Sequence, residues 1–148
     1  MSTTTIERSA SPSALKSIFT GAIAGLGGGL VFGIMMGMQG MLPMVGMLVR
    51  QENAVVGFIV HMIISALIGA SYGFIAPRLP SGWGTAVISG ALYGAAWWVL
   101  GALVLMPLML GMTQMVFVIG GPQIMSLVGH IVYGVITGVV FVPLSNRL

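Results

Sequence analysis

A small residue or a histidine recurs at every fourth position in four segments of the chain, and this spacing constrains the fold most. Residues four apart lie on one face of an α-helix. Small side chains let two helix backbones approach closely, as helices do in a bilayer, where lipid is as apolar as leucine. We therefore expect glycine-zipper faces that pack membrane helices together. The positions are Gly21, Gly25, Gly29, Gly33 and Gly37; Gly57, His61, Ser65, Gly69 and Gly73; Ala86, Gly90 and Gly94; and Ser126, His130, Gly134 and Gly138.

The composition also indicates a membrane environment. Of 148 residues, 57% are hydrophobic and 5% are charged, whereas soluble domains are about 25% charged. Uncharged stretches cover residues 17–49, 53–77 and 79–146, and a spanning helix needs about 20 apolar residues. The last stretch must turn near Gly120, Gly121 and Pro122, where helix breakers cluster. We predict an all-α, polytopic membrane protein with four transmembrane helices, at 17–40, 54–76, 84–106 and 123–144.

The two halves of the chain are similar, which predicts two tandem helical hairpins. Repeat 1 covers about 17–79 and repeat 2 about 84–148. Two spans per unit preserve orientation, so the repeats are parallel and related by an axis along the membrane normal. A shift of 65 residues places Gly25 on Gly90, Gly29 on Gly94, Met41 on Met106, Met44 on Met109 and Met47 on Met112, and a shift of 69 places His61 on His130, Gly69 on Gly138 and Arg78 on Arg147.

The basic residues predict the orientation in the membrane, because Lys and Arg are enriched in cytoplasmic loops. With four spans, Arg8, Lys16, Arg78 and Arg147 share one side and Arg50 lies alone on the other. We expect a multi-pass protein of the bacterial inner (plasma) membrane with both termini in the cytoplasm. Residues 1–16 are predicted to be a flexible cytoplasmic tail, and 17–148 a single four-helix transmembrane domain.

The first uncharged stretch is too long for one straight span. Residues 17–49 would extend about 50 Å as a helix, whereas the hydrocarbon core is about 30 Å thick. Gly40 and Pro43 offer a break. We therefore expect residues 43–50, and likewise residues 107–119 after Pro107, to lie at the outer interface of the membrane or to bend back toward the helices.

Several unusual residues follow one another in a fixed order. They are His61 with Ser65, the run Gly90-x-x-x-Gly94-x-x-Trp97-Trp98, Leu105-Met106-Pro107, and Gly129-His130. In this order the chain resembles the YagU-like family of small, poorly characterised bacterial inner-membrane proteins over residues 55–135, although its connection between the first two spans is much shorter. The resemblance implies a membrane protein of a group that has been linked to acid tolerance, and it supplies no mechanism.

His61 and His130 are the only histidines of the chain, and they form a candidate functional pair within the membrane. An ionisable group there is a functional hypothesis by default, because burying it is costly. Three interpretations are open. The imidazoles are structural and bond neighbours such as Ser65, Ser126, Gln39 or Gln123; or they handle protons, since histidine titrates near neutrality; or they ligate a haem b held between two helices.

Methionine is frequent, with 13 residues, and its thioether is a soft ligand that selects Cu(I). Many of these residues recur at every third position: Met35, Met38, Met41, Met44 and Met47, then Met106, Met109, Met112 and Met115. In an α-helix a spacing of three shifts by about 60° per step, so such residues form no single ligand column. Because methionine is also a flexible apolar filler, we predict no metal site.

The sequence predicts no enzyme. The only acids, Glu7 and Glu52, lie near the membrane surfaces, and no catalytic set can be assembled. The 5 basic residues form no cluster, which excludes nucleic-acid binding.

We expect a structural or accessory component in the lipid bilayer that self-associates or joins a larger membrane complex, with no cofactor. The alternatives are a small proton-conducting or transport protein that uses the His61/His130 pair, and a bis-histidine haem-binding electron carrier.

Overall fold

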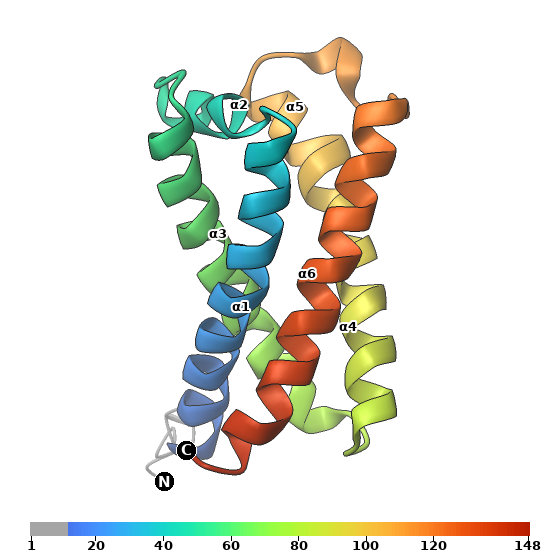
Figure 1. The fold of residues 1–148 in the computed structure, drawn as a ribbon. Helices are drawn as coiled ribbons and strands as arrows, with labels where there is room; N and C mark the ends of the chain where they lie inside the picture. The colour runs from blue at the N-terminus through green and yellow to red at the C-terminus, as the bar shows by residue number, and fades with distance from the viewer. Residues whose placement is uncertain (1–11) are drawn as a thin grey trace, which may run out of the picture.

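The computed structural model describes residues 12–148, and all regular elements in that range are helical (Figure 1). Four long helical stretches have the length and apolar character to cross a membrane. This confirms the predicted all-α fold class with four spans. The elements are α1 (Pro12–Met38), α2 (Leu42–Gly46), η1 (Met47–Val49), α3 (Ala54–Ile75), η2 (Ala76–Arg78), α4 (Trp83–Trp97), the π-helical segment η3 (Trp98–Leu105), α5 (Met106–Met109), η4 (Thr113–Met115) and α6 (Gly121–Ser145).

The first helix begins earlier than predicted. Of the expected tail, residues 1–11 lie outside the described part of the chain, and α1 already starts at Pro12. Proline is well tolerated in a first helical turn, since the N–H that it lacks would have no helical partner there. The helical part therefore includes residues 12–16, which we had assigned to the tail.

The chain leaves the first span at the predicted break. Gly40 adopts a positive φ of 66°, and α2 then lies over the end of the α1–α3 pair (Figure 1). Leu42, Val45 and Gly46 of α2 are buried, and Gly57 on α3 packs against the backbone of Leu42. This segment thus bends back onto the helices, one of the two arrangements that we expected.

The third span continues through Pro107 instead of ending there. Proline has no N–H to donate, so Pro107 makes no backbone hydrogen bond to the preceding turn. The carbonyl of Leu103, in that π-helical turn, accepts a hydrogen bond from the N–H of Phe117 at 3.1 Å. The helix persists to Met109, Gly111 takes a positive φ of 72°, and the following loop is held against η3.

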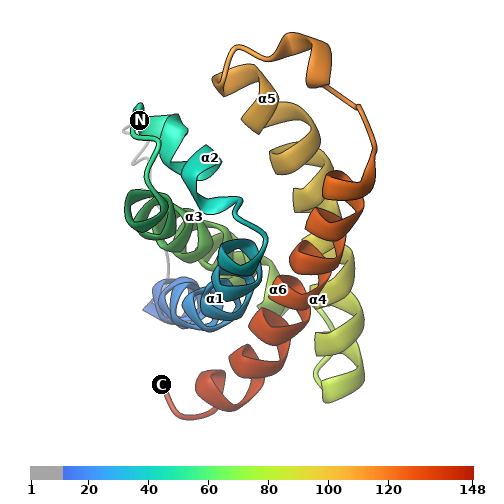
Figure 2. The same cartoon turned by 45° about the horizontal axis from the view of Figure 1, so that its top comes forward.

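The four spans pair along their small-residue faces (Figure 2). Helix α1 packs on α3, and α4 packs on α6; α1 and α6 join the two pairs. We call α1–α3 the first hairpin and α4–α6 the second hairpin. The internal sequence repeat stays a prediction, since a pairing of helices does not test it.

Glycines at both hairpin interfaces leave no room for a side chain. A Cβ at Gly25 would lie 2.7 Å from Cα of Gly69, and a Cβ at Gly134 would lie 2.9 Å from the backbone nitrogen of Gly94. Such contacts are backbone to backbone, which is why only glycine fits. The same holds at the positions that surround them: Gly21 and Gly73 in the first hairpin, and Gly90 and Gly138 in the second.

Not every position of the expected faces packs one span on another. Gly37 is exposed, and a Cβ there would meet only Leu42, at 3.4 Å. The chain leaves the helix just beyond it, so no partner helix lies opposite. Gly57 faces α2, which is not a span, whereas Gly33 does pack α1 on α3, against the side chains of Phe58 and His61. Our assignment of Gly37 to helix packing was therefore wrong.

The opposite faces of the helices are apolar and exposed, as expected of surfaces in contact with lipid. On α1 and α3 these residues also recur at every fourth position, offset from the glycines. They are Leu26, Leu30, Ile34 and Met38 on α1, and Val55, Ile59, Ile63 and Leu67 on α3.

Candidate functional site

His61 lies on α3 at the interface with α1 and is 7% exposed. Its Nε2 is 2.9 Å from the carbonyl oxygen of Gly29 and 3.5 Å from Oγ of Ser65. A carbonyl only accepts, so Nε2 carries the hydrogen and Nδ1 carries none in the neutral ring. The bond to Gly29 links two helices of the first hairpin, and Ser65 is one of the partners that we expected.

His130 lies on α6 and bonds within its own helix. Its Nδ1 donates to the carbonyl oxygen of Ser126 at 2.8 Å and lies 3.3 Å from Oγ of the same residue. Nε2 therefore carries no hydrogen in the neutral ring. Ser126 is thus an expected partner as well, although it serves the histidine and not a contact between helices.

The two glutamines that we considered as partners bond elsewhere. Gln39 donates from Nε2 to the carbonyl oxygen of Met35 at 3.1 Å. Gln123 accepts from the N–H of Gly120 at 3.1 Å, which fixes the start of α6. Neither amide reaches a histidine because each closes its own helix end.

Phe32 of α1 lies between the two imidazoles. Its ring centroid is 5.3 Å from that of His61 and 4.8 Å from that of His130, with edge-on geometry in both cases. The histidines thus share one aromatic neighbour, which places them at a similar level in the bundle. A macrocycle held by both imidazoles would have to displace Phe32, so this geometry does not favour the haem interpretation.

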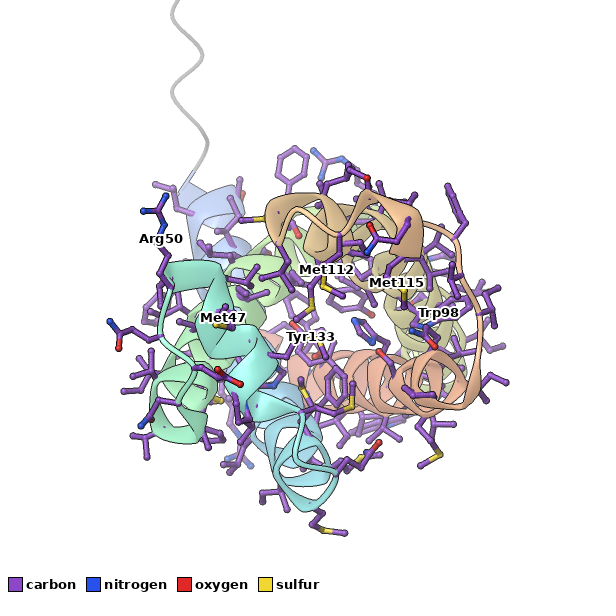
Figure 3. All side chains as sticks on the ribbon, turned by 90° about the horizontal axis from the view of Figure 1, so that it is seen from above. Met47, Arg50, Trp98, Met112, Met115 and Tyr133 are labelled. Carbon is purple, nitrogen blue, oxygen red and sulfur yellow. The ribbon has the colours of Figure 1, made fainter. Side chains whose placement is uncertain are left out.

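Both histidines line a cavity of about 390 Å³ at the end of the bundle where α2 and α5 lie. We call it the methionine cavity. Both hairpins contribute to its lining. The first hairpin provides Phe32 and Met36 from α1 and Ile64 and Ile68 from α3. The second provides Trp97 from α4, Gly101 and Ala102 from η3, and Gln123 from α6. Met112 and Met115 line this cavity, and both lie at the end of the bundle that faces the viewer in Figure 3.

Each imidazole keeps one ring nitrogen without a hydrogen-bond partner among the described residues, Nδ1 in His61 and Nε2 in His130. Both residues line the methionine cavity. These hydrogen-free nitrogens can accept a hydrogen bond or coordinate a cation.

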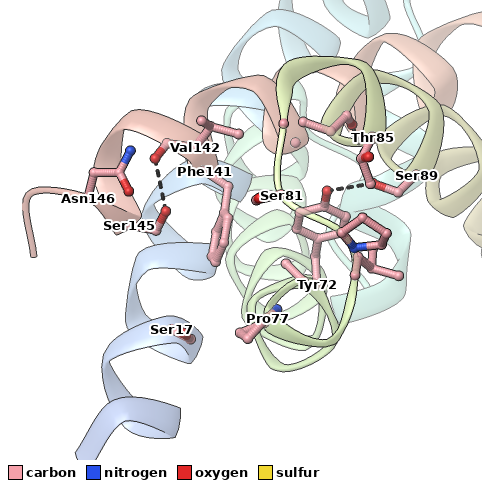
Figure 4. A pocket seen from close by; sticks show the side chains of 16 residues that line it. Ser17, Tyr72, Pro77, Ser81, Thr85, Ser89, Phe141, Val142, Ser145 and Asn146 are labelled. Carbon is pink, nitrogen blue, oxygen red and sulfur yellow. Dashed lines mark hydrogen bonds between the residues drawn. The ribbon is translucent and has the colours of Figure 1, made fainter.

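A second cavity, of about 510 Å³, lies at the end of the bundle where α1 begins and α6 ends (Figure 4). We call it the terminal cavity. Hydroxyls dominate its polar lining, among them Ser17, Thr85, Ser89 and Ser145, and its lining holds neither a histidine nor a formally charged side chain. It lies between the two hairpins as well.

Three tyrosines link the hairpins between these cavities, and sequence analysis missed them. Tyr72 bonds Ser89 at 2.9 Å, Tyr93 donates to the carbonyl of Ile68 at 2.8 Å, and Tyr133 donates to the carbonyl of Ser65 at 2.7 Å. These are all the tyrosines of the chain. A phenol inside an apolar span needs a hydrogen-bond partner, and this signal was available in the sequence. Phe32 had no such signal.

No known family model, curated protein or solved structure matches this chain. The resemblance to the YagU-like family stays a prediction.

Proposed function

We propose that this integral membrane protein is a binding protein whose ligand occupies the methionine cavity. The observation that carries the proposal is that one histidine from each hairpin lines the same cavity, each with a ring nitrogen that has no hydrogen-bond partner among the described residues. A cavity of about 390 Å³ lies within the range of small-molecule sites, which are apolar spaces with a few convergent polar groups.

A binding site explains the open space beside the two histidines, which close helix packing alone does not require. Closely packed helices would bury both imidazoles against protein, with a hydrogen-bond partner for every ring nitrogen. Instead the hairpins separate at this end, and the wall contains small residues, Gly101 and Ala102. We propose no catalytic role, and we place the methionine cavity on the side opposite the cytoplasm, following the distribution of Lys and Arg.

The test is native mass spectrometry of the full-length protein extracted directly from cell membranes. Ala102→Phe would fill the cavity, and Leu92→Phe adds a ring on the lipid-exposed face of α4 as the matched control. We expect a bound mass on the wild type and on Leu92→Phe that Ala102→Phe lacks. The absence of any bound mass on the wild type, or the same mass on all three proteins, would overturn the proposal.

Transport is the second candidate function, and the terminal cavity favours it. Both cavities lie between the same two hairpins, with the tyrosines and their serine partners between them. Movement of the hairpins about this layer would open one cavity while closing the other. Proton flux into liposomes should then fall in the His61→Ala/His130→Ala variant; an unchanged flux argues against a role of the pair in proton transport.

The glycines from which we expected self-association, Gly21, Gly25, Gly29 and Gly33, are buried within the first hairpin. A partner helix would therefore pack on the exposed apolar faces of the spans instead. Self-association and membership in a larger complex both stay predictions.

A further inference from the structure

Seven methionines from separate segments meet at the methionine cavity. Their spacing gives no common face on one helix, but the chain is not one helix here. α1 ends, α2 packs on the end of α3, and the loop after α5 folds back onto η3. The thioethers that line the cavity belong to Met36, Met41, Met44, Met106, Met109, Met112 and Met115.

The members differ in depth. Met36 is 7% exposed, whereas Met109 is 68% exposed; Met41, Met106 and Met115 are half-buried. The seven methionines therefore lie at depths that extend from the surface of the protein to the level of the histidines. Methionine has three rotatable bonds and adapts its shape, so these side chains can close around a ligand smaller than the cavity.

The remaining donors of the cavity are neutral. Its lining contains no carboxylate, lysine or arginine, and the chain has 0 cysteines. Hard cations such as Mg²⁺ and Ca²⁺ require several oxygen ligands, which this lining does not supply. Thioether and imidazole are the donors that suit soft metals, and thioether selects Cu(I) in particular.

The absence of anionic donors also bears on the charge of the ligand. The cost of moving an ion into a medium of low dielectric constant rises with the square of its charge. A site without a compensating carboxylate, at membrane depth, therefore favours a monovalent cation over a divalent one. Cu(I) and its chemical analogue Ag(I) are both soft and monovalent.

We infer that the methionine cavity binds a soft monovalent cation, Cu(I), through methionine thioethers and a free imidazole nitrogen of His61 or of His130, since Phe32 lies between the two rings. The inference rests on the proposed function and names its ligand class. The exposed Met109 and Met112 receive the cation at the mouth, and the buried Met36 and one of the histidines hold it deeper in the bundle.

The full chain in lipid nanodiscs is titrated anaerobically with Cu(I) in competition with bicinchoninate, and separately with Ag(I). We expect saturable binding of both ions and no comparable binding of Zn(II). Met36→Leu/Met106→Leu should weaken binding by at least about tenfold, by analogy with the losses that follow perturbation of metal sites. Leucine preserves the volume of methionine, so this variant should keep the fold.

Met38→Leu is the matched control, because Met38 is 81% exposed and does not line the cavity; it should bind as the wild type does. His61→Gln/His130→Asn tests the imidazoles and should also weaken binding. Failure of Cu(I) and Ag(I) to bind, or equal affinity in the wild type and Met36→Leu/Met106→Leu, overturns the inference. An organic mass lost from Ala102→Phe alone would in that case leave the proposed function standing.

Discussion

The ring of Phe32 on α1 lies so close to Gly129 on α6 that a Cβ at residue 129 would overlap it. This contact joins the two hairpins at the level of the histidines. It also holds Phe32 in its position between His61 and His130. Gly129 therefore determines how the methionine cavity is bounded, although it does not line that cavity.

Gly129→Ala should destabilise the protein by about 1–3 kcal/mol, the usual cost of overpacking. The added methyl group must push the ring of Phe32 toward the imidazoles. Gly27→Ala is the control, since a Cβ at Gly27 meets nothing within 4 Å. Thermal unfolding in detergent, followed by tryptophan fluorescence, measures both; equal melting temperatures for the two variants would contradict the packing argument.

Gly134→Ala should cost more than Gly129→Ala, at or above the upper end of that range of about 1–3 kcal/mol. Its Cβ would meet the backbone of Gly90, which cannot rotate away as a ring can. The α4–α6 pair would have to separate. Gly84→Ala, at an open position of α4, should leave the melting temperature near that of the wild type, and a Gly134→Ala protein as stable as that control would be unexpected.

Tyr93→Phe should lower the free energy of unfolding by about 0.6 kcal/mol, the average for interhelical hydrogen bonds in membranes, and by no more than about 1.7 kcal/mol, the largest value. The hydroxyl bonds both the carbonyl of Ile68 and Oγ of Ser71 on the neighbouring helix. Ser71→Ala removes only one of these bonds and should cost less. The free energies of unfolding of the two single variants and of the double variant give the coupling energy between Tyr93 and Ser71. Strictly additive effects on that free energy would show that the two side chains do not interact.

His61→Ala should destabilise the protein more than His130→Ala. The imidazole of His61 bonds Gly29 across two helices, whereas that of His130 bonds Ser126 one turn earlier in the same helix. His61→Gln, whose amide can donate from the place of Nε2, should restore part of the stability. Unfolding measurements on the three variants decide the order, and a larger effect of His130→Ala would refute it.

Much of the fold could be predicted from the sequence because its signals are local. A membrane-spanning helix needs only a long enough apolar run, and a close helix contact needs only a face of small residues. The spans, the break near Gly40 and most of the packing glycines follow from this. Gly37 did not follow, because the sequence pattern continues beyond the point where the partner helix ends.

The convergence of side chains at one end of the bundle was decided by tertiary structure alone. The spacing of methionines at every third position excludes a column of methionines on one helix, and that exclusion is correct. However, the sequence could not state that α2 packs on the end of α3 or that Phe117 bonds back to Leu103. Those long-range contacts bring methionines from several segments to the cavity that the two histidines line, because the hairpins touch along α1 and α6 and separate where their connecting segments lie.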